Sequence, residues 1–238
     1  MSKIIESNSF SEILNHVDEK TLVLFDIDGT LIEPTSLLGG PAWFAHVFAM
    51  LSKKGLEEEV VVEKTYAAWV RLQKTISVRT IEKNTADVVK KIHEKNVQTM
   101  ALTGRAFGDS EMTFNQLKSV NISFEKNTIH NEVLDFGNRN GFYRGILSAG
   151  LTGDKGENLI EFFEKINFFP EKMVFVDDLP FYIEEVKKIA DAKNIEFTGI
   201  RYGAADDRYV TFDPARAIED IKIIFKDSDH QDLIDVLG

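Results

Sequence analysis

The chain has 238 residues, a length that fits one ordinary domain with an insertion or two small domains. Its composition is that of a soluble globular protein, with 43% apolar and 28% charged residues. It has no cysteine, which excludes disulfides, thiol nucleophiles and cysteine-ligated zinc. Its formal net charge of −11 leaves no general basic surface for nucleic acid or an anionic membrane.

The N-terminal region has no continuous apolar core of signal-peptide length, and no run of about 18 apolar residues occurs in the chain. We therefore expect a cytoplasmic protein without a membrane or nucleic-acid partner, although a processed form of an exported precursor fits the same observation. Nothing in the sequence indicates an oligomeric state.

Short apolar runs predict strands that are buried on both faces of a sheet. They cover residues 21–25, 97–102, 173–176 and 195–200. Apolar residues at three- and four-residue spacing predict helices, and Pro214 marks the start of a further one. These helices cover residues 79–94, 110–119, 155–166 and 180–192. Strands that alternate with helices predict an α/β fold with a mainly parallel sheet, whose ligands bind beyond the carboxyl ends of the strands.

Two stretches interrupt this alternation. Residues 35–78 predict two or three helices, and within residues 122–150 the stretch Gly137–Gly141 resembles a hairpin turn. We therefore assign residues 1–34 and 79–238 to the core and residues 35–78 to a small helical domain, and we allow for a hairpin flap within residues 122–150.

Asp26 and Asp28 follow the first predicted strand and flank the turn at Gly29. Residues two apart on an extended chain point to the same side, so both carboxylates face one site at the strand end. Gly29 permits a sharp turn and a close approach of the backbone to a ligand. A solvated acidic turn is the alternative for this motif alone. A calcium loop is disfavoured, because Leu31 stands where an EF-hand needs glycine.

Two further segments carry candidate phosphate ligands. Thr103, Gly104 and Arg105 end the second predicted strand, where a hydroxyl and main-chain amides form either a phosphate cradle or a simple helix N-cap. Arg105 either contacts the substrate or pairs with a neighbouring carboxylate. Lys155 opens a predicted helix beside small residues that let a ligand approach, although most lysines are solvated.

Asp177 and Asp178 follow the third predicted strand. Two adjacent carboxylates at the end of a buried strand repel one another unless a cation lies between them and their neighbours. Together with Asp26 and Asp28 they form an oxygen-rich site suited to Mg²⁺, which keeps some waters and binds substrate phosphate.

In this order, the segments DIDGT, LTGR, the lysine of DKG, and VDD resemble the four motifs of the haloacid dehalogenase superfamily of phosphohydrolases. The resemblance covers about residues 20–200, and strings such as VLFDIDGTL and DKGENL are similar to a bacterial branch of unknown function. It implies a haloacid dehalogenase-like three-layer α/β sandwich with a Rossmann-type sheet. It also implies that residues 35–78 form a small, mainly helical cap that selects the substrate.

The resemblance also implies catalytic roles. Asp26 would attack phosphorus and form an aspartyl-phosphate, and Asp28 would protonate the leaving alcohol and then activate water. Thr103, with Gly104 and Arg105, would bind the phosphoryl group, and Lys155 would balance its charge. The implied ligands of Mg²⁺ are Asp26, Asp28 through its main-chain carbonyl, Asp177, and Asp178 directly or through water.

The predicted function is therefore Mg²⁺-dependent hydrolysis of a small phosphorylated metabolite. There are two alternatives. One is a phosphotransferase, and the other is a catalytically silent protein with a phosphate-binding or regulatory role. A receiver domain is excluded, because receivers place the acidic pair on the first strand and the phosphate acceptor later. Candidates for binding a second anionic group of the substrate are Arg71, Arg139, Arg144 and Arg201.

Overall fold

The computed structural model describes residues 2–150 and 153–237. The chain divides into two compact units. Unit 1 consists of Met1–Ile32 and Thr80–Ala205, and unit 2 of Glu33–Arg79 and Asp206–Gly238. Each unit therefore contains two separate stretches of the chain.

Unit 1 is built on an eight-stranded sheet with the strand order β1-β10-β9-β2-β5-β8-β7-β6. The pairs from β1 through β8 are parallel, and β7 and β6 add two antiparallel pairs at the edge. The prediction of an α/β fold with a mainly parallel sheet is therefore confirmed. The bounds are β1 (Lys3–Ser7), β2 (Thr21–Phe25), β5 (Gln98–Thr103), β6 (Leu134–Gly137), β7 (Asn140–Tyr143), β8 (Ile146–Ser148), β9 (Lys172–Asp177) and β10 (Glu196–Tyr202).

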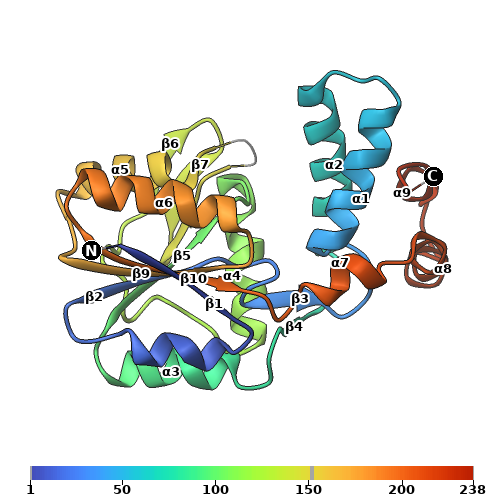
Figure 1. Ribbon diagram of the computed structural model, residues 1–238. Helices are drawn as coiled ribbons and strands as arrows, with labels where there is room; N and C mark the ends of the chain where they lie inside the picture. The colour runs from blue at the N-terminus through green and yellow to red at the C-terminus, as the bar shows by residue number, and fades with distance from the viewer. Residues whose placement is uncertain (1, 151–152, 238) are drawn as a thin grey trace. The chain divides into compact units, whose positions relative to one another are not determined.

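Helices cover both faces of this sheet. In Figure 1, α5 and α6 lie over one face, and α3 lies under the other beside the 3-10 helix η1. The observed bounds of α4, α5 and α6 are those that the sequence predicted. The bounds are η1 (Phe10–Asn15), α3 (Thr85–Glu94), η2 (Phe107–Asp109), α4 (Ser110–Ser119), α5 (Lys155–Ile166) and α6 (Pro180–Ala192).

The helix predicted over residues 79–94 begins six residues later than expected, at Thr85. Residues Val78–Thr80 instead form β4, which pairs with β3 (Ile32–Pro34) in a separate two-stranded sheet. The Thr85 hydroxyl donates to the main-chain oxygen of Glu82 at 2.9 Å, which closes the turn before the helix. The apolar spacing of the segment did not distinguish a short strand and turn from a first helical turn.

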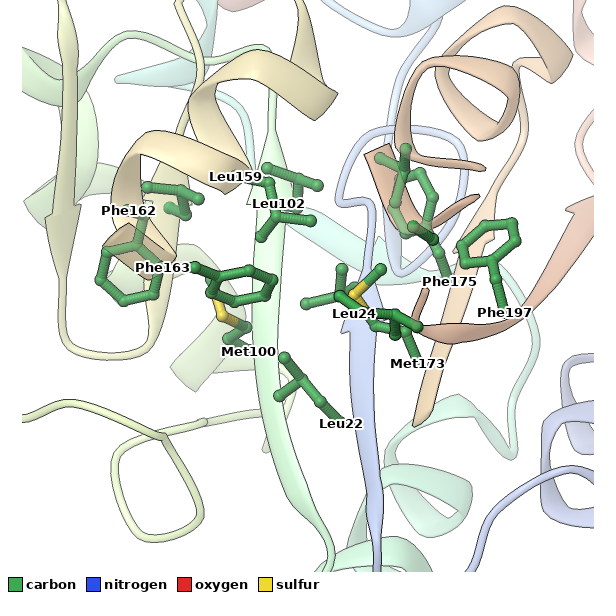
Figure 2. Packing of buried hydrophobic residues seen from close by; sticks show 14 of the residues in the cluster. Leu22, Leu24, Met100, Leu102, Leu159, Phe162, Phe163, Met173, Phe175 and Phe197 are labelled. Atoms are coloured by element: carbon green, nitrogen blue, oxygen red, sulfur yellow. The ribbon is translucent and has the colours of Figure 1, made fainter. Parts of the chain in front are cut away.

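The main core of unit 1 lies between the sheet and helices α5 and α6. Figure 2 shows how leucine, methionine and phenylalanine side chains from β2, β5, β9, β10 and α5 pack there. Leu22 and Leu24 of β2 face this cluster, whereas the ring of Phe25 stacks on Phe10 and Phe124. The predicted strands are continuous apolar runs because both of their faces are buried.

Unit 2 is helical. It contains α1 (Pro41–Lys53) and α2 (Glu58–Gln73) from its first stretch. Its second stretch contributes α7 (Asp207–Thr211), α8 (Pro214–Ile224) and α9 (Gln231–Asp235). The assignment of residues 206–238 to the core was therefore wrong.

Contacts between the two stretches of unit 2 explain this correction. His46 of α1 makes a 3.2 Å hydrogen bond with the main-chain oxygen of Leu237, and Arg71 of α2 pairs with Asp232. The Arg71 guanidinium also lies 5.6 Å from the ring centre of Phe225. The apolar pattern of the C-terminal helices predicts that they bury a face, but it does not name the partner of that face.

The predicted hairpin exists, with Asn138 and Arg139 at its turn, both at positive φ. Its second strand, β7, pairs with β8 of the main sheet. The hairpin is thus an extension of that sheet and not a separate flap.

Helices α5 and α6 pack closely at Gly156. A Cβ built on Gly156 would lie 2.5 Å from the main-chain oxygen of Glu185 and 2.9 Å from Cγ1 of Ile189. The contact with Glu185 cannot be relieved without shifting α6, because the atoms met there belong to the backbone. Glycine at this position therefore sets how closely the helix that carries Lys155 approaches its neighbour.

We predict that Gly156→Ala lowers the free energy of unfolding by about 1–3 kcal/mol, the usual cost of overpacking. Gly108→Ala is the matched control, because a Cβ there meets no heavy atom within 4 Å. Both tryptophans of the chain, Trp43 and Trp69, belong to unit 2. Urea unfolding of unit 1 is therefore best followed by circular dichroism, and equal stability of the two variants would contradict the prediction.

Candidate functional site

Three neighbouring strands, β9, β2 and β5, end at one edge of the sheet, and their registers bring the predicted residues together there. Phe25 is level with Val176 of β9 and with Ala101 of β5. The main-chain N–H of Asp26 donates to the oxygen of Val176 at 2.9 Å, so the pairing extends one residue beyond the strand. Asp26 therefore lies directly past the end of β2 and is held there by backbone hydrogen bonding.

Lys155 is the first residue of α5 and is completely buried. Its Nζ donates to Oδ1 of Asp26 and to Oδ2 of Asp177, both at 2.7 Å. The helix start is well defined, because the Asp154 side chain caps it and Oδ1 accepts from the Glu157 N–H at 2.9 Å. An ammonium thus joins the carboxylates at the ends of β2 and β9.

Asp177 and Asp178 are also held by the local backbone. Oδ1 of Asp177 accepts from the Leu179 N–H at 2.8 Å, and the Asp178 N–H donates to the Thr30 hydroxyl at 3.1 Å. One carboxylate oxygen from each of Asp26, Asp177 and Asp178 lies within 4.8 Å of the others. Oxygens bound to one Mg²⁺ at about 2.1 Å are about 3 to 4 Å apart, so these three residues fit such an ion with small side-chain adjustments.

Burial dominates the electrostatics of this cluster. It raises the pKa of Asp26, which the Lys155 ammonium only partly opposes, and it raises the pKa of Asp177 to about 7. The pKa of Asp178 is raised well above its ordinary value by burial and by the charges of its neighbours. Burial alone would lower the pKa of Lys155, but the charges of Asp177 and Asp26 outweigh it and raise that pKa. Three carboxylates share one ammonium, so the cluster lacks positive charge.

Asp28 has a different partner. Arg105 binds both of its carboxylate oxygens, through Nε and Nη2, at 2.7 Å each. The Arg105 guanidinium is itself fixed, because Nη1 donates to Gln116 at 2.7 Å and to Thr113 at 3.2 Å, both on α4. Of the two predicted roles of Arg105, pairing with a neighbouring carboxylate is the one present here. The side chain of Asp28 is not part of the three-carboxylate group found among the described residues.

Thr103 and Gly104 complete the edge of the sheet. Thr103 is buried at the end of β5, and its hydroxyl accepts from the Arg105 N–H at 3.2 Å. A Cβ built on Gly104 would lie 3.4 Å from the hydroxyl of Tyr182 and 3.8 Å from the main-chain oxygen of Gly150. The absence of a side chain at Gly104 therefore leaves room beside Tyr182.

Three residues that support this cluster were not predicted from the sequence. Thr30 belongs to the DIDGT segment and is completely buried, so that motif contained a signal for it. Glu185 accepts from the Lys155 N–H at 2.9 Å, and Tyr182 places its ring centre 4.1 Å from the Lys155 Nζ. Both lie on α6, where no residue pattern singled them out.

Several arginines considered for a second anionic group are paired elsewhere in the structure. Arg71 pairs with Asp232, Arg144 lies 3.6 Å from Glu125, and Arg201 lies 3.7 Å from Glu6. The main-chain oxygen of Arg139 accepts from the Phe107 N–H at 2.7 Å. These contacts do not select one arginine for substrate.

Among solved structures, the chain is similar to a haloacid dehalogenase-like family hydrolase from Streptococcus pneumoniae. The similarity has a TM-score of 0.46 at 13% sequence identity and covers 75% of this chain and 93% of that one.

Among curated proteins, relatives occur in Chlamydia. One from Chlamydia trachomatis is 27% identical over 205 residues, covering 85% of this chain and 77% of the relative. One from Chlamydia muridarum is 27% identical over 182 residues, covering 76% and 69%. Each is named a putative outer membrane protein.

These names contradict the prediction of a cytoplasmic location, which was wrong. That prediction depended only on the lack of a long apolar segment. Within the described part of the chain, no helix has the length and apolar character needed to cross a membrane.

The sequence profile of one family matches residues 6–235, nearly the whole chain, and the description of that family is "Protein of unknown function (DUF2608)". The predicted membership of a family of unknown function is thereby confirmed. The chain belongs to the DUF2608 family.

Proposed function

We propose that this protein is a phosphatase that hydrolyses a small phosphate monoester, with Asp26 as the nucleophile. One observation carries the proposal: Asp26 shares a buried cluster with Asp177 and Asp178, and the Lys155 ammonium lies 2.7 Å from its Oδ1. An exposed acidic turn would not hold a buried lysine at this distance. The order of the motifs along the chain supports the same chemistry.

The charge balance of the cluster supports a divalent cation. Three buried carboxylates against one ammonium leave an excess of negative charge, which is costly away from water. Asp26, Asp177 and Asp178 would hold Mg²⁺, with the main-chain carbonyl of Asp28 as a further expected ligand. When bound, Mg²⁺ neutralises negative charge on the phosphate oxygens and lets an anionic substrate approach an acidic protein.

In the first step, an Asp26 oxygen attacks phosphorus and forms an aspartyl-phosphate, while the bond from phosphorus to the ester oxygen breaks. The leaving alcohol takes its proton from Asp28. Lys155 offsets the charge of the reacting carboxylate and phosphoryl group, and Thr103 donates its hydroxyl hydrogen to a phosphoryl oxygen.

In the second step, water attacks the phosphorus of the aspartyl-phosphate, and Asp28 accepts a proton from that water. The bond between phosphorus and the Asp26 oxygen breaks, which restores the carboxylate and releases inorganic phosphate. Because one residue acts first as an acid and then as a base, its carboxyl group must stay in the same place through both steps.

Arg105 supplies that placement for the carboxylate form of Asp28, which is the form that accepts a proton in the second step. Its two-pronged contact with Asp28 fixes the plane of the carboxylate, and its contacts to α4 fix the guanidinium in turn. We propose that Arg105 is a positioning residue for Asp28.

We predict that the pure protein releases phosphate from a generic aryl phosphate only when Mg²⁺ is present. Asp26→Asn should lower kcat at least about a thousandfold, because the amide cannot form the acyl-phosphate intermediate. Asp87→Asn, an exposed residue in the first turn of α3, is the control and should retain full activity. Absence of turnover by the parent protein on a broad panel of phosphate esters would contradict the proposal and favour the phosphate-binding alternative.

We predict opposite effects of Asp178→Asn with and without metal. In metal-free buffer the variant should melt at a higher temperature than the parent, because it removes one of three crowded buried carboxylates. In Mg²⁺ the order should reverse, since the parent gains stability from the ion and the variant binds it at least about tenfold more weakly. Calorimetric melting curves across a Mg²⁺ titration measure both effects, and an equal Mg²⁺ response in the two proteins would refute the assigned ligands.

We predict that Arg105→Lys lowers kcat by about ten- to a hundredfold, because lysine cannot bind both oxygens of Asp28. KM should change much less, since Asp28 and not the substrate is the partner of Arg105. Arg216→Lys makes the same exchange at an exposed position of α8 and should be neutral. A rise in KM at unchanged kcat would instead place Arg105 on the substrate.

A further inference from the structure

Tyr182 lies beside the candidate active site, and the proposed reaction gives it no role. It stands in the first turn of α6, which begins directly after the segment that carries Asp177 and Asp178. Its N–H donates to the main-chain oxygen of Leu179 at 3.2 Å, so the turn that follows the carboxylates also places the tyrosine.

The ring of Tyr182 covers the Lys155 ammonium. Its centre is 4.1 Å from Nζ, closer than the ring centre of Phe175 at 5.5 Å. A cation over an aromatic face is stabilised most where water is excluded, and Lys155 is completely buried. The aromatic ring of Tyr182 therefore already has a partner in the protein, the Lys155 ammonium.

The hydroxyl of Tyr182 lies beside Gly104. It lies 3.4 Å from the place that a Cβ on Gly104 would occupy. Tyr182 is partly buried, and among the residues that the structure describes its hydroxyl makes no hydrogen bond. The hydroxyl is not one of the fully buried polar atoms that lack a partner, so it is open to solvent. This donor lies beside the turn that follows Thr103 and is therefore available to a ligand bound there.

Tyr182 thus reaches from Lys155 to the Thr103–Gly104 turn. These are the two groups to which the proposed function assigns the phosphoryl group. We propose that the Tyr182 hydroxyl donates a hydrogen bond to an oxygen of the bound phosphate group, an inference that rests on the proposed function. Burial raises the pKa of this phenol above its ordinary value near 10, so the hydroxyl keeps its proton at neutral pH.

The test compares Tyr182→Phe with the parent chain in Mg²⁺, with inorganic phosphate as the probe in titration calorimetry. Phenylalanine keeps the ring over Lys155 and removes only the hydroxyl. The Kd for phosphate should rise about tenfold, the usual effect of losing one hydrogen bond to a charged group. KM for an aryl phosphate should rise by a similar factor while kcat changes less than about threefold.

Two further variants separate the hydroxyl from the ring. Tyr182→Leu removes both, so it should show the same loss of phosphate affinity and, in addition, a fall in kcat of about tenfold as Lys155 becomes hydrated. Tyr143→Phe removes a tyrosine hydroxyl on β7, away from Lys155, and should bind phosphate like the parent. Melting curves check that all variants fold. If Tyr182→Leu does not fold, the comparison of Tyr182→Phe with the parent tests the role of the hydroxyl by itself.

The outcomes distinguish this inference from the proposed function. If the parent turns over esters and Tyr182→Phe binds phosphate within about twofold of it, the inference is overturned and the phosphatase stands. If the parent hydrolyses no ester but binds phosphate in a way that needs the Tyr182 hydroxyl, the phosphatase fails and the inference stands. If the parent binds no phosphate, both are overturned.

Discussion

The contact on which this structure depends most is the Lys155 ammonium held between Asp26 and Asp177, 2.7 Å from each. A completely buried lysine is costly unless its charge is met, and here two carboxylates from neighbouring strands meet it. Helix α5 starts at this edge of the sheet with Lys155, and it packs tightly on α6, which Gly156 permits. One ion cluster therefore couples the ends of two strands to the start of a helix.

The cluster holds more acidic groups than basic ones, and this imbalance supports the proposed metal-dependent chemistry. A protein with a formal charge of −11 binds an anion only where positive charge is concentrated locally. Lys155 provides one such charge and a bound cation would provide the rest. Asp28 is kept apart from the cluster by Arg105, so the carboxylate proposed for proton transfer has an environment of its own. Separate environments allow chemically identical side chains to do different work.

Unit 2 is assembled from two stretches that are far apart in the sequence. Its two stretches are separated by more than a hundred residues of chain, yet they form one compact unit through contacts such as His46 with Leu237 and Arg71 with Asp232. Glu33 is nearly buried and binds both Arg79 and Arg208, so each stretch also contributes to one ion cluster within the unit. The C-terminal stretch is thus an integral part of the helical unit.

The sequence by itself determined the strands that are buried on both faces, three of the helices to the residue, and the acidic and basic residues that gather at the edge of the sheet. These are local or strictly periodic signals: an apolar run, a helical spacing, a turn after a strand. Only the tertiary structure decided that β1, a largely exposed edge strand, pairs with β10, that residues 206–238 join unit 2, and that Arg105 binds Asp28. It also placed Tyr182 over Lys155. Each of these depends on which surfaces meet across long sequence separations, and a periodic pattern shows that a face is buried without showing what covers it.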